Sequence, residues 1–185
     1  MLKGERVILR GVTREDLSRF CEFSSDVEFA VLEGGVPWTP PSLARMQTRF
    51  DDDLRREASE SRVEFAIEAD GKLIGGISLR DINPTSGTAE LGVGIGDREY
   101  WGRGYGRDAV RVILRYAFIM RNLNRVWLQT GSLNERAIRC YRACGFVQEG
   151  VLRQHDWSDG GRRDAVCMGV LRDEWEASQP RMPSP

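Results

Sequence analysis

The stretch Glu99-Tyr100-Trp101-Gly102-Arg103-Gly104-Tyr105-Gly106-Arg107-Asp108-Ala109 places three glycines on alternate positions and two arginines among them. Apolar residues then recur at helical spacing from Val110 to Phe118, which predicts a helix that ends near Asn122. The first backbone amides of a helix lack intrahelical partners and carry partial positive charge. Glycines let an anion approach those amides closely, and the arginines add charge. The stretch therefore predicts a phosphate- or pyrophosphate-binding loop rather than a turn that only starts a helix.

Two common nucleotide motifs do not fit this loop. Gly104 to Ala109 satisfies the dinucleotide pattern GxGxxA, but a polar segment, 96–100, separates it from the preceding strand. The next strand, which ends at 128–131, supplies no acidic residue for a ribose, and the chain has no Gly-Lys-Ser/Thr as a Walker motif requires. The alternative prediction, a dinucleotide-dependent oxidoreductase, therefore rests on the GxGxxA match alone.

The strand before the loop, Glu90-Leu91-Gly92-Val93-Gly94-Ile95-Gly96, carries glycines that fall on one face of a regular strand. Interior glycines weaken a strand and indicate a bulge or a close backbone approach. If this strand separates from its neighbour at 126–130, its free amides and carbonyls can pair with an amide-bearing arm. Strand and loop together indicate a ligand with peptide-like bonds and a diphosphate, and coenzyme A has both.

With these features the sequence resembles the GNAT superfamily of N-acetyltransferases. Trp101 to Gly106 resembles the family's acetyl-CoA loop, R/Q-x-x-G-x-G/A, with Trp101 in place of the usual first residue. The resemblance continues through the downstream segments Asn134-Glu135-Arg136-Ala137 and Tyr141-Arg142-Ala143-Cys144-Gly145-Phe146. Asp164 and Glu174-Trp175 are similar to the branch that acetylates ribosomal-protein N-termini, polyamines and some antibiotics.

The resemblance implies a role for several residues. Tyr141 is expected to act as the acid for the departing thiolate, and the alternative is a tyrosine that is only part of the buried core. Asn134 is expected to hydrogen-bond the pantetheine arm, but it is also a good helix N-cap. Strand amides near Val93, Gly94 and Ile95 are expected to hold the arm and the acetyl carbonyl. The residues expected to bind the cofactor phosphates are those of the loop, Trp101, Gly102, Arg103, Gly104, Tyr105, Gly106 and Arg107.

The general base is less clearly indicated. Glu90 lies on the central strand and could take the amine proton through water, or it could be a solvated carboxylate. His155, the one histidine, has a suitable reference pKa but stands among polar residues at a strand end, as a surface histidine would. Cys140 adjoins Tyr141 and suggests an acyl-cysteine route. The sequence places no histidine beside it, so direct attack in a ternary complex is preferred.

The acceptor site is expected to come from residues 24–42 and from the turn at 154–163. Glu28 and Glu33, in a segment expected to be a loop (28–39), could attract a cationic acceptor, or they could be ordinary surface carboxylates. We therefore expect an enzyme that moves the acetyl group of acetyl-CoA to a primary amine, either a protein N-terminus or a small cationic amine. The alternative is a non-catalytic acyl-CoA-binding or sensor domain on the same fold.

The order of the elements predicts an α/β domain over residues 1–175, followed by a flexible tail over 176–185 that contains three prolines. We expect strands at 2–10, 63–67, 73–82, 88–95, 126–130, 146–154 and 163–171. They would form a mixed, mainly antiparallel seven-stranded sheet flanked by about four helices, with one helical crossover between the strands at 88–95 and 126–130.

Composition sets limits on other functions. The 185 residues are 41% hydrophobic and 30% charged with a net charge of −1, as in an ordinary globular domain and unlike a protein whose whole surface binds nucleic acid. No apolar run approaches the roughly 20 residues that span a bilayer. Four scattered cysteines read as reduced thiols, and one histidine makes a zinc site improbable. We expect a cytoplasmic monomer or homodimer that binds no metal, nucleic acid or membrane.

Overall fold

The computed structural model describes residues 1–32, 38–55, 60–158 and 160–179. Within these ranges the chain forms one mixed sheet of eight strands in the order β1-β2-β3-β4-β5-β6-β8-β7. The strands are β1 (Leu2–Lys3), β2 (Ile8–Arg10), β3 (Val63–Ala69), β4 (Lys72–Asn83), β5 (Thr88–Ile95), β6 (Arg125–Gly131), β7 (Val147–Ser158) and β8 (Gly161–Leu171). All neighbours are antiparallel except β5 and β6, which are parallel and joined by the predicted helical crossover.

Six α-helices accompany the sheet in the described part of the chain. They are α1 (Asp16–Ser25), α2 (Val27–Leu32), α3 (Leu43–Arg55), α4 (Tyr105–Arg115), α5 (Glu135–Arg142) and α6 (Arg172–Ser178). A short 3₁₀ turn, η1 (Arg98–Tyr100), precedes the glycine loop, and a π-helical turn, η2 (Tyr116–Met120), ends the crossover helix. No helix among the described residues is both long and apolar enough to cross a membrane.

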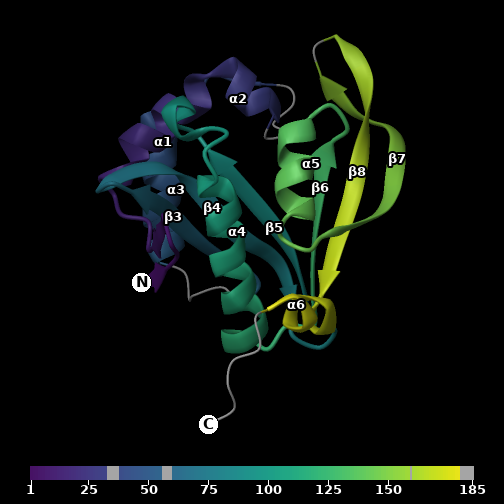
Figure 1. The fold of residues 1–185 in the computed structure, drawn as a ribbon. Helices are drawn as coiled ribbons and strands as arrows, with labels where there is room; N and C mark the ends of the chain where they lie inside the picture. The colour runs from purple at the N-terminus through teal and green to yellow at the C-terminus, as the bar shows by residue number, and fades with distance from the viewer. Residues whose placement is uncertain (33–37, 56–59, 159, 180–185) are drawn as a thin grey trace.

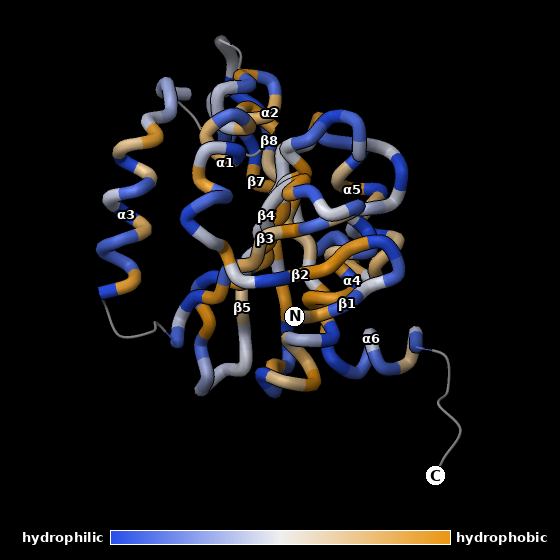
Figure 2. Tube along the Cα trace, turned by 90° about the vertical axis from the view of Figure 1, so that its left-hand side faces the viewer, coloured by the Kyte–Doolittle hydropathy of each residue, from blue (hydrophilic) through white to orange (hydrophobic). Residues whose placement is uncertain are grey.

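The crossover helix forms the centre of the core. Val110, Ile113 and Leu114 of α4, followed by Ala117 and Phe118, are fully buried, as their helical spacing predicts. The helix packs across β2, β4 and β5, whereas α1 packs against β4, α2 and α3. By contrast α3 stands at the outer side of the molecule, and none of its residues is buried (Figure 2).

Local turn chemistry matches the sequence at three further places. Asp70 and Gly71 both have positive φ in the two-residue turn between β3 and β4, as an Asp-Gly pair between two strands predicts. Gly145 ends α5 with a φ of 94°, and Asn134 caps the N-terminus of that helix. In the hairpin between β7 and β8, residues 158 and 161 are paired, and residue 159 lies outside the described part.

The structure corrects the expected number of strands. Residues 2–10 were expected to form one strand, but they form β1 and β2, which pair with each other. The cause is Asp108 in the first turn of α4, whose side chain is buried and accepts hydrogen bonds from the backbone nitrogens of Glu5, Arg6 and Val7 at 3.2, 2.7 and 3.0 Å. The chain turns around this carboxylate, so the sheet gains an eighth strand and the N-terminus is attached to α4.

The helix count is corrected at two segments. Residues 28–32 were assigned to a loop, yet they belong to α2, whose six residues are too few for a helical pattern of apolar residues to be recognised. The helix α6 was not expected. It continues past residue 175, the expected end of the domain, to Ser178, while 180–185 lie outside the described residues.

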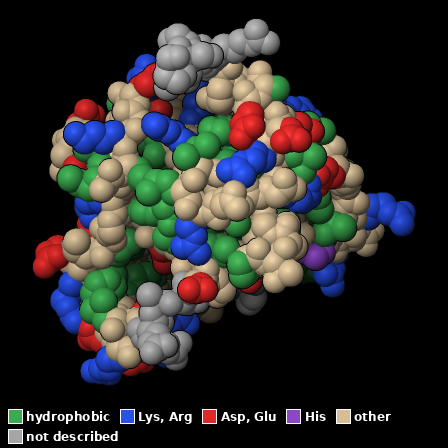
Figure 3. Space-filling model, turned by 90° about the horizontal axis from the view of Figure 1, so that it is seen from below, with side chains coloured by type: hydrophobic (Ala, Val, Ile, Leu, Met, Phe, Trp, Pro, Cys, Tyr) green, Lys and Arg blue, Asp and Glu red, His purple; other side chains and the backbone are tan. Residues whose placement is uncertain are grey.

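The surface shows no single-sign field on the side that Figure 3 presents, where hydrophobic, basic and acidic side chains are mixed. His155, the purple side chain in Figure 3, is exposed on β7. Among the described residues, no group of three or more His, Cys, Asp or Glu side chains is arranged to hold a metal ion.

The parallel pairing of β5 with β6 is short. Only Thr88, Ala89 and Glu90 are in register, with Arg125, Val126 and Trp127. Beyond that point the two strands diverge (Figure 1), although β5 stays paired with β4 through Ile95 and β6 stays paired with β8 through Gly131. Residues 91–95 of β5 therefore present one unpaired backbone edge to a gap, as the glycine-containing strand predicts.

The carboxylate of Asp108 gives a test of the N-terminal fold. Asp108→Ala should lower the free energy of unfolding by about 3 kcal/mol, because three backbone donors lose a charged acceptor at a buried position. Chemical denaturation followed by circular dichroism measures this change. The control is Asp52→Ala, which removes an exposed ion pair with Arg55 and should cost less than about 1 kcal/mol. Equal losses in the two variants would show that Asp108 does not hold the N-terminal segment.

Candidate active site

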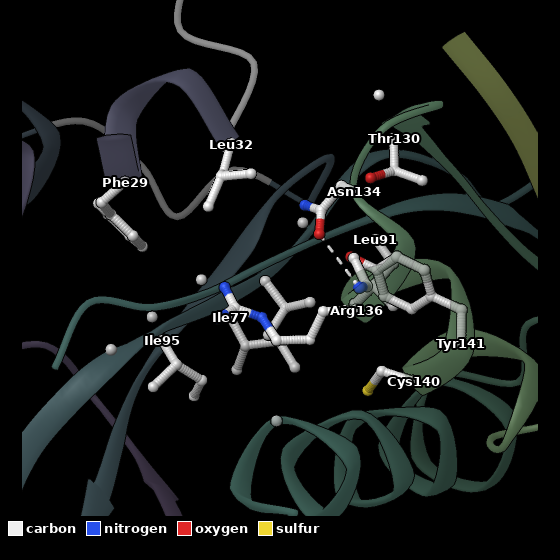
Figure 4. A pocket seen from close by; sticks show the side chains of 18 of the residues that line it. Phe29, Leu32, Ile77, Leu91, Ile95, Thr130, Asn134, Arg136, Cys140 and Tyr141 are labelled. Carbon is white, nitrogen blue, oxygen red and sulfur yellow. Dashed lines mark hydrogen bonds between the residues drawn. The ribbon is translucent and has the colours of Figure 1, made fainter. Parts of the chain in front are cut away.

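A cavity of about 1360 Å³ occupies the gap between β5 and β6 and continues to the glycine loop. Its walls come from segments far apart in sequence: residues 90–95 of β5, the loop after η1, one face of α5 and the end of β6. Figure 4 shows Phe29 and Leu32 of α2 on the side opposite α5. The diverging strands thus bring the predicted loop, the free strand edge and the α5 residues into one continuous space.

The glycine loop has the geometry of an anion site. Gly104 is the N-cap of α4 with a φ of 89°, a left-handed conformation that favours glycine, and no side chain caps the helix there. The first amides of α4 are therefore available to a ligand. Arg103 and Arg107, both exposed, line the cavity beside them. Tyr105 and Gly106, which were assigned to the loop from the sequence, already form the first turn of α4.

Trp101 does more than the sequence indicates. Its side chain takes part as well as its backbone, because the indole nitrogen donates a hydrogen bond to the carbonyl oxygen of Ile95 at 2.5 Å. The guanidinium carbon of Arg136 lies 3.9 Å from the centroid of the indole ring, which is a cation–π contact. Trp101 thereby connects the end of β5 to the start of α5. Nothing in the spacing of the motif reveals this contact, because it joins three separate segments.

On β5, Val93, Gly94 and Ile95 line the cavity at the unpaired edge of the strand. Gly96, by contrast, is required for packing within the protein. A Cβ there would lie 2.2 Å from the ring of Phe23, so Gly96 allows α1 to pack against the strand end. One of the three predicted close approaches is therefore made by the protein itself.

Asn134 and Tyr141 lie together at the centre of the cavity. Asn134 Oδ1 accepts a hydrogen bond from the backbone nitrogen of Ala137 at 3.1 Å, so its predicted role as N-cap is confirmed, while the side chain also lines the cavity. Tyr141 is buried, and Figure 4 shows its ring pointing from α5 into the cavity beside Leu91 and Asn134. The seven-residue spacing on α5 places both side chains on the same face of the helix.

Cys140 on α5 and Cys144, just beyond the end of that helix, are both free thiols. A hydrogen bond from the Cys144 thiol lowers the pKa of Cys140, with a further contribution from the positive charges of Arg107 and Arg111. The same hydrogen bond and burial raise the pKa of Cys144. Cys140 lines the cavity, and Figure 4 shows its sulfur pointing toward α4. No histidine is among the described residues that line the cavity with it.

Glu90 lies where the gap begins, and its side chain is 19% exposed. It accepts a hydrogen bond from Arg80 Nη2 at 3.0 Å and lines the cavity. The expected acceptor residues are placed differently. Glu28 is 62% exposed and paired with Arg98 at 2.7 Å, outside the described lining, and Glu33 lies outside the described residues.

The two segments expected to build the acceptor site both reach the cavity. Phe29, Val31 and Leu32 line it from α2, and Asp156 and Arg163 line it from β7 and β8. Sequence reasoning missed the α2 side chains because it read the segment as a loop, although its apolar content was visible. It also missed Arg136, which reads as a solvated helix position.

Comparison with known proteins agrees with this geometry. The model of the family described as "Acetyltransferase (GNAT) domain" matches residues 6–147. The chain is 28% identical to spermidine N(1)-acetyltransferase of Escherichia coli K12, over 96% of this chain and 92% of that protein. It is 32% identical to the Bacillus subtilis protein named "Putative ribosomal N-acetyltransferase YdaF", over 72% of each chain.

A solved structure of similar fold is spermidine N-acetyltransferase from Vibrio cholerae in complex with CoA and spermine. The TM-score is 0.83 at 24% identity, covering 92% of this chain and 98% of that one. At this identity the similarity establishes the fold, whereas the family model and the sequence relatives establish that the proteins are homologous.

Gly104, the left-handed N-cap of α4, allows a test of the glycine loop as an anion site. Gly104→Asp should weaken the binding of CoA, the ligand of the solved relative, at least about tenfold, because a carboxylate would stand beside the phosphates and a side chain is strained at this φ. Isothermal titration calorimetry measures the affinity. Gly71→Asp is the matched control, because Gly71 also has a positive φ but lies in the turn between β3 and β4. Undiminished CoA affinity in Gly104→Asp would exclude the loop as the phosphate site.

Proposed function

This chain belongs to the GNAT acetyltransferase family, and we propose that it transfers the acetyl group of acetyl-CoA to a primary amine, either a protein N-terminus or a small cationic amine. The observation that carries the proposal is the single cavity in which an uncapped helix N-terminus with two arginines, an unpaired strand edge and a buried tyrosine meet. A module that only binds the cofactor needs the helix N-terminus and the strand edge. A transferase also needs an acid where the strands diverge, and the buried tyrosine is that acid.

The cofactor fits the residues present. The amides of Tyr105, Gly106 and Arg107 and the guanidinium groups of Arg103 and Arg107 would hold the diphosphate. The pantetheine arm carries two amides, and it would enter the gap and pair with the free edge of residues 93–95 as an added strand does. The side-chain amide of Asn134 would donate to the same arm, because only its oxygen is used in capping the helix.

The chemistry requires a neutral amine, a polarised thioester carbonyl and a proton for the leaving thiolate. We assign the first task to Glu90, which would accept a proton from the incoming ammonium through a water molecule. The neutral amine then attacks the thioester carbon, and free amides of residues 93–95 stabilise the oxyanion. As the carbon–sulfur bond breaks, the Tyr141 hydroxyl gives its proton to the thiolate. The products are the acetylated amine and CoA. Glu90 releases the first amine proton to solvent, and the second proton, which the nitrogen loses as the tetrahedral intermediate collapses, passes through water to restore Tyr141.

Direct attack suits this site better than an acetyl-cysteine intermediate. Cys140 has a lowered pKa, but Figure 4 shows its sulfur directed toward α4, away from the side of α5 that carries Tyr141. A covalent route also needs a base and a second acyl transfer, and no histidine among the described lining residues could serve it. The one histidine, His155, is exposed on β7.

The role of Tyr141 is tested by removing its hydroxyl. Tyr141→Phe should reduce kcat about a hundredfold or more and leave the affinity for acetyl-CoA within about twofold, because proton transfer to the thiolate occurs only during turnover. A thiol-release assay gives kcat with a panel of polyamines, aminoglycosides and Ala- or Ser-starting peptides, and calorimetry gives the affinity.

Tyr116→Phe is the matched control, since Tyr116 lies in η2 against Phe65 and outside the described lining of the cavity. Cys140→Ala distinguishes the two routes in the same assay, and direct attack requires that it keep most of the turnover. Unchanged kcat in Tyr141→Phe would remove the tyrosine from the mechanism, and inactivity of Cys140→Ala would favour the covalent route.

A further inference from the structure

The cavity carries an unusual number of arginines for a site that accepts a cation. Among the described residues that line it, seven are arginines and three are carboxylates: Arg62, Arg80, Arg103, Arg107, Arg136, Arg139, Arg163, Glu64, Glu90 and Asp156. Four of the arginines belong to the glycine loop, the first turn of α4 and α5, where the proposed function places the polyanionic cofactor. The remaining charges therefore decide which acceptor the cavity favours.

Four of these charges form a compact group at the Glu90 end of the cavity. The strand register aligns Arg80 of β4 with Glu90 of β5, and it aligns Glu64 of β3 with Ser78 of β4. Arg80 Nη2 lies 3.0 Å from Glu90 Oε1, and Arg62 Nη2 lies 3.1 Å from Glu64 Oε2. Each carboxylate of the group is thus held by an arginine, and the net charge of the four is zero.

On another wall, a third carboxylate lies opposite an arginine in the strand register. Asp156 and Arg163 line the cavity as cross-strand partners in the pairing of β7 with β8. Each of the three described lining carboxylates therefore has an arginine on the same or the adjacent strand. Among the described lining residues, these pairings leave no surplus of negative charge for a ligand that is positive along its whole length.

A polyamine fits such a site poorly. Its ammonium groups would have to displace guanidinium groups from Glu64 and Glu90, or lie beside them at the cost of like-charge repulsion. An amine that also carries a carboxylate meets the site differently, because each of its charges finds an opposite partner. Arg80 is the group to receive that carboxylate: its side chain is 44% exposed, and a guanidinium has five N–H donors for forked binding of carboxylate oxygens.

We infer that the acceptor of this enzyme carries a carboxylate close to its reacting amine, as an amino acid or a peptide with an acidic residue near its N-terminus does. This inference rests on the proposed acetyl transfer and names its acceptor class. The amine lies toward Glu90, which takes its proton, and the carboxylate lies on the outer side of Arg80 with Arg62 next to it. Arg80 is a specificity residue that binds the acceptor rather than a participant in proton transfer.

Matched acceptors that differ in one carboxylate test the inference. The peptide arm compares Ser-Asp-Gly amide with Ser-Asn-Gly amide, and the amino-acid arm compares lysine with 1,5-diaminopentane, which is lysine without its carboxylate. We expect kcat/KM to be about tenfold or more higher for the carboxylate-bearing member in at least one arm, and spermidine to be a poor acceptor. The arm that shows the larger ratio identifies the source of the acceptor.

A variant of Arg80 is tested with the same ratio of kcat/KM between the two matched acceptors. Arg80→Gln should bring the ratio of kcat/KM between the two members of the preferred pair close to one, mainly through a higher KM for the acidic member. Any effect of Arg80 on Glu90 applies to both members and cancels in the ratio. Arg153→Gln, at an exposed position of β7 outside the described lining, is the control and should keep the full ratio.

Equal kcat/KM within both pairs, a preference for spermidine, or an unchanged ratio in Arg80→Gln would overturn the inference. If no acceptor is acetylated, calorimetric binding of the same pairs to the CoA-saturated protein decides, and equal binding overturns it as well. Failure of the protein to bind acetyl-CoA would instead refute the proposed function, so the two outcomes are distinguishable.

Discussion

The functional architecture depends on one limit to backbone pairing: β5 and β6 share only three residue pairs before they diverge. β5 stays paired with β4 as far as Ile95, with one register shift before Glu90, and β6 stays paired with β8 along its whole length. The gap therefore costs only the hydrogen bonds along one edge of β5 and one edge of β6. Those unpaired groups are the means by which an amide-bearing ligand can be bound. The elements that follow the two strands, the glycine loop with α4 and then α5, stand on either side of the same opening.

Two attachments keep the opening in shape. Asp108 connects α4 to the N-terminal segment through three backbone donors, and this fixes the helix whose first turn faces the cavity. Trp101 then bridges the end of β5 and Arg136 on α5. The contacts of Asp108 and Trp101 therefore hold the glycine loop from both sides, and this preorganises its amides before a ligand arrives.

Much of this could be predicted from local sequence. Short-range rules account for the buried period of α4, the Asp70-Gly71 turn, the cap at Asn134 and the left-handed Gly145. The short helices α2 and α6 were missed, since six or seven residues offer too little periodicity.

The division of the first strand and the contacts of Trp101 were missed for another reason. Both depend on partners far away in the chain: Asp108 lies about a hundred residues from the backbone it binds, and Arg136 comes from a different helix. Of the candidate site, the sequence supplied the loop, the strand and Tyr141 but not the arginine beside each described lining carboxylate, because strand register is set by tertiary pairing.

Hydrogen–deuterium exchange of residues 88–95 with and without acetyl-CoA tests the central claim most directly. Thr88 and Glu90 are paired on both sides and serve as an internal reference, whereas 91–95 have one free edge. If the cofactor arm binds in the gap, about two amides in 91–95 should become protected on addition of acetyl-CoA, since alternate amides of a strand face each edge. Protection at the glycine loop with unchanged exchange at 91–95 would contradict the account.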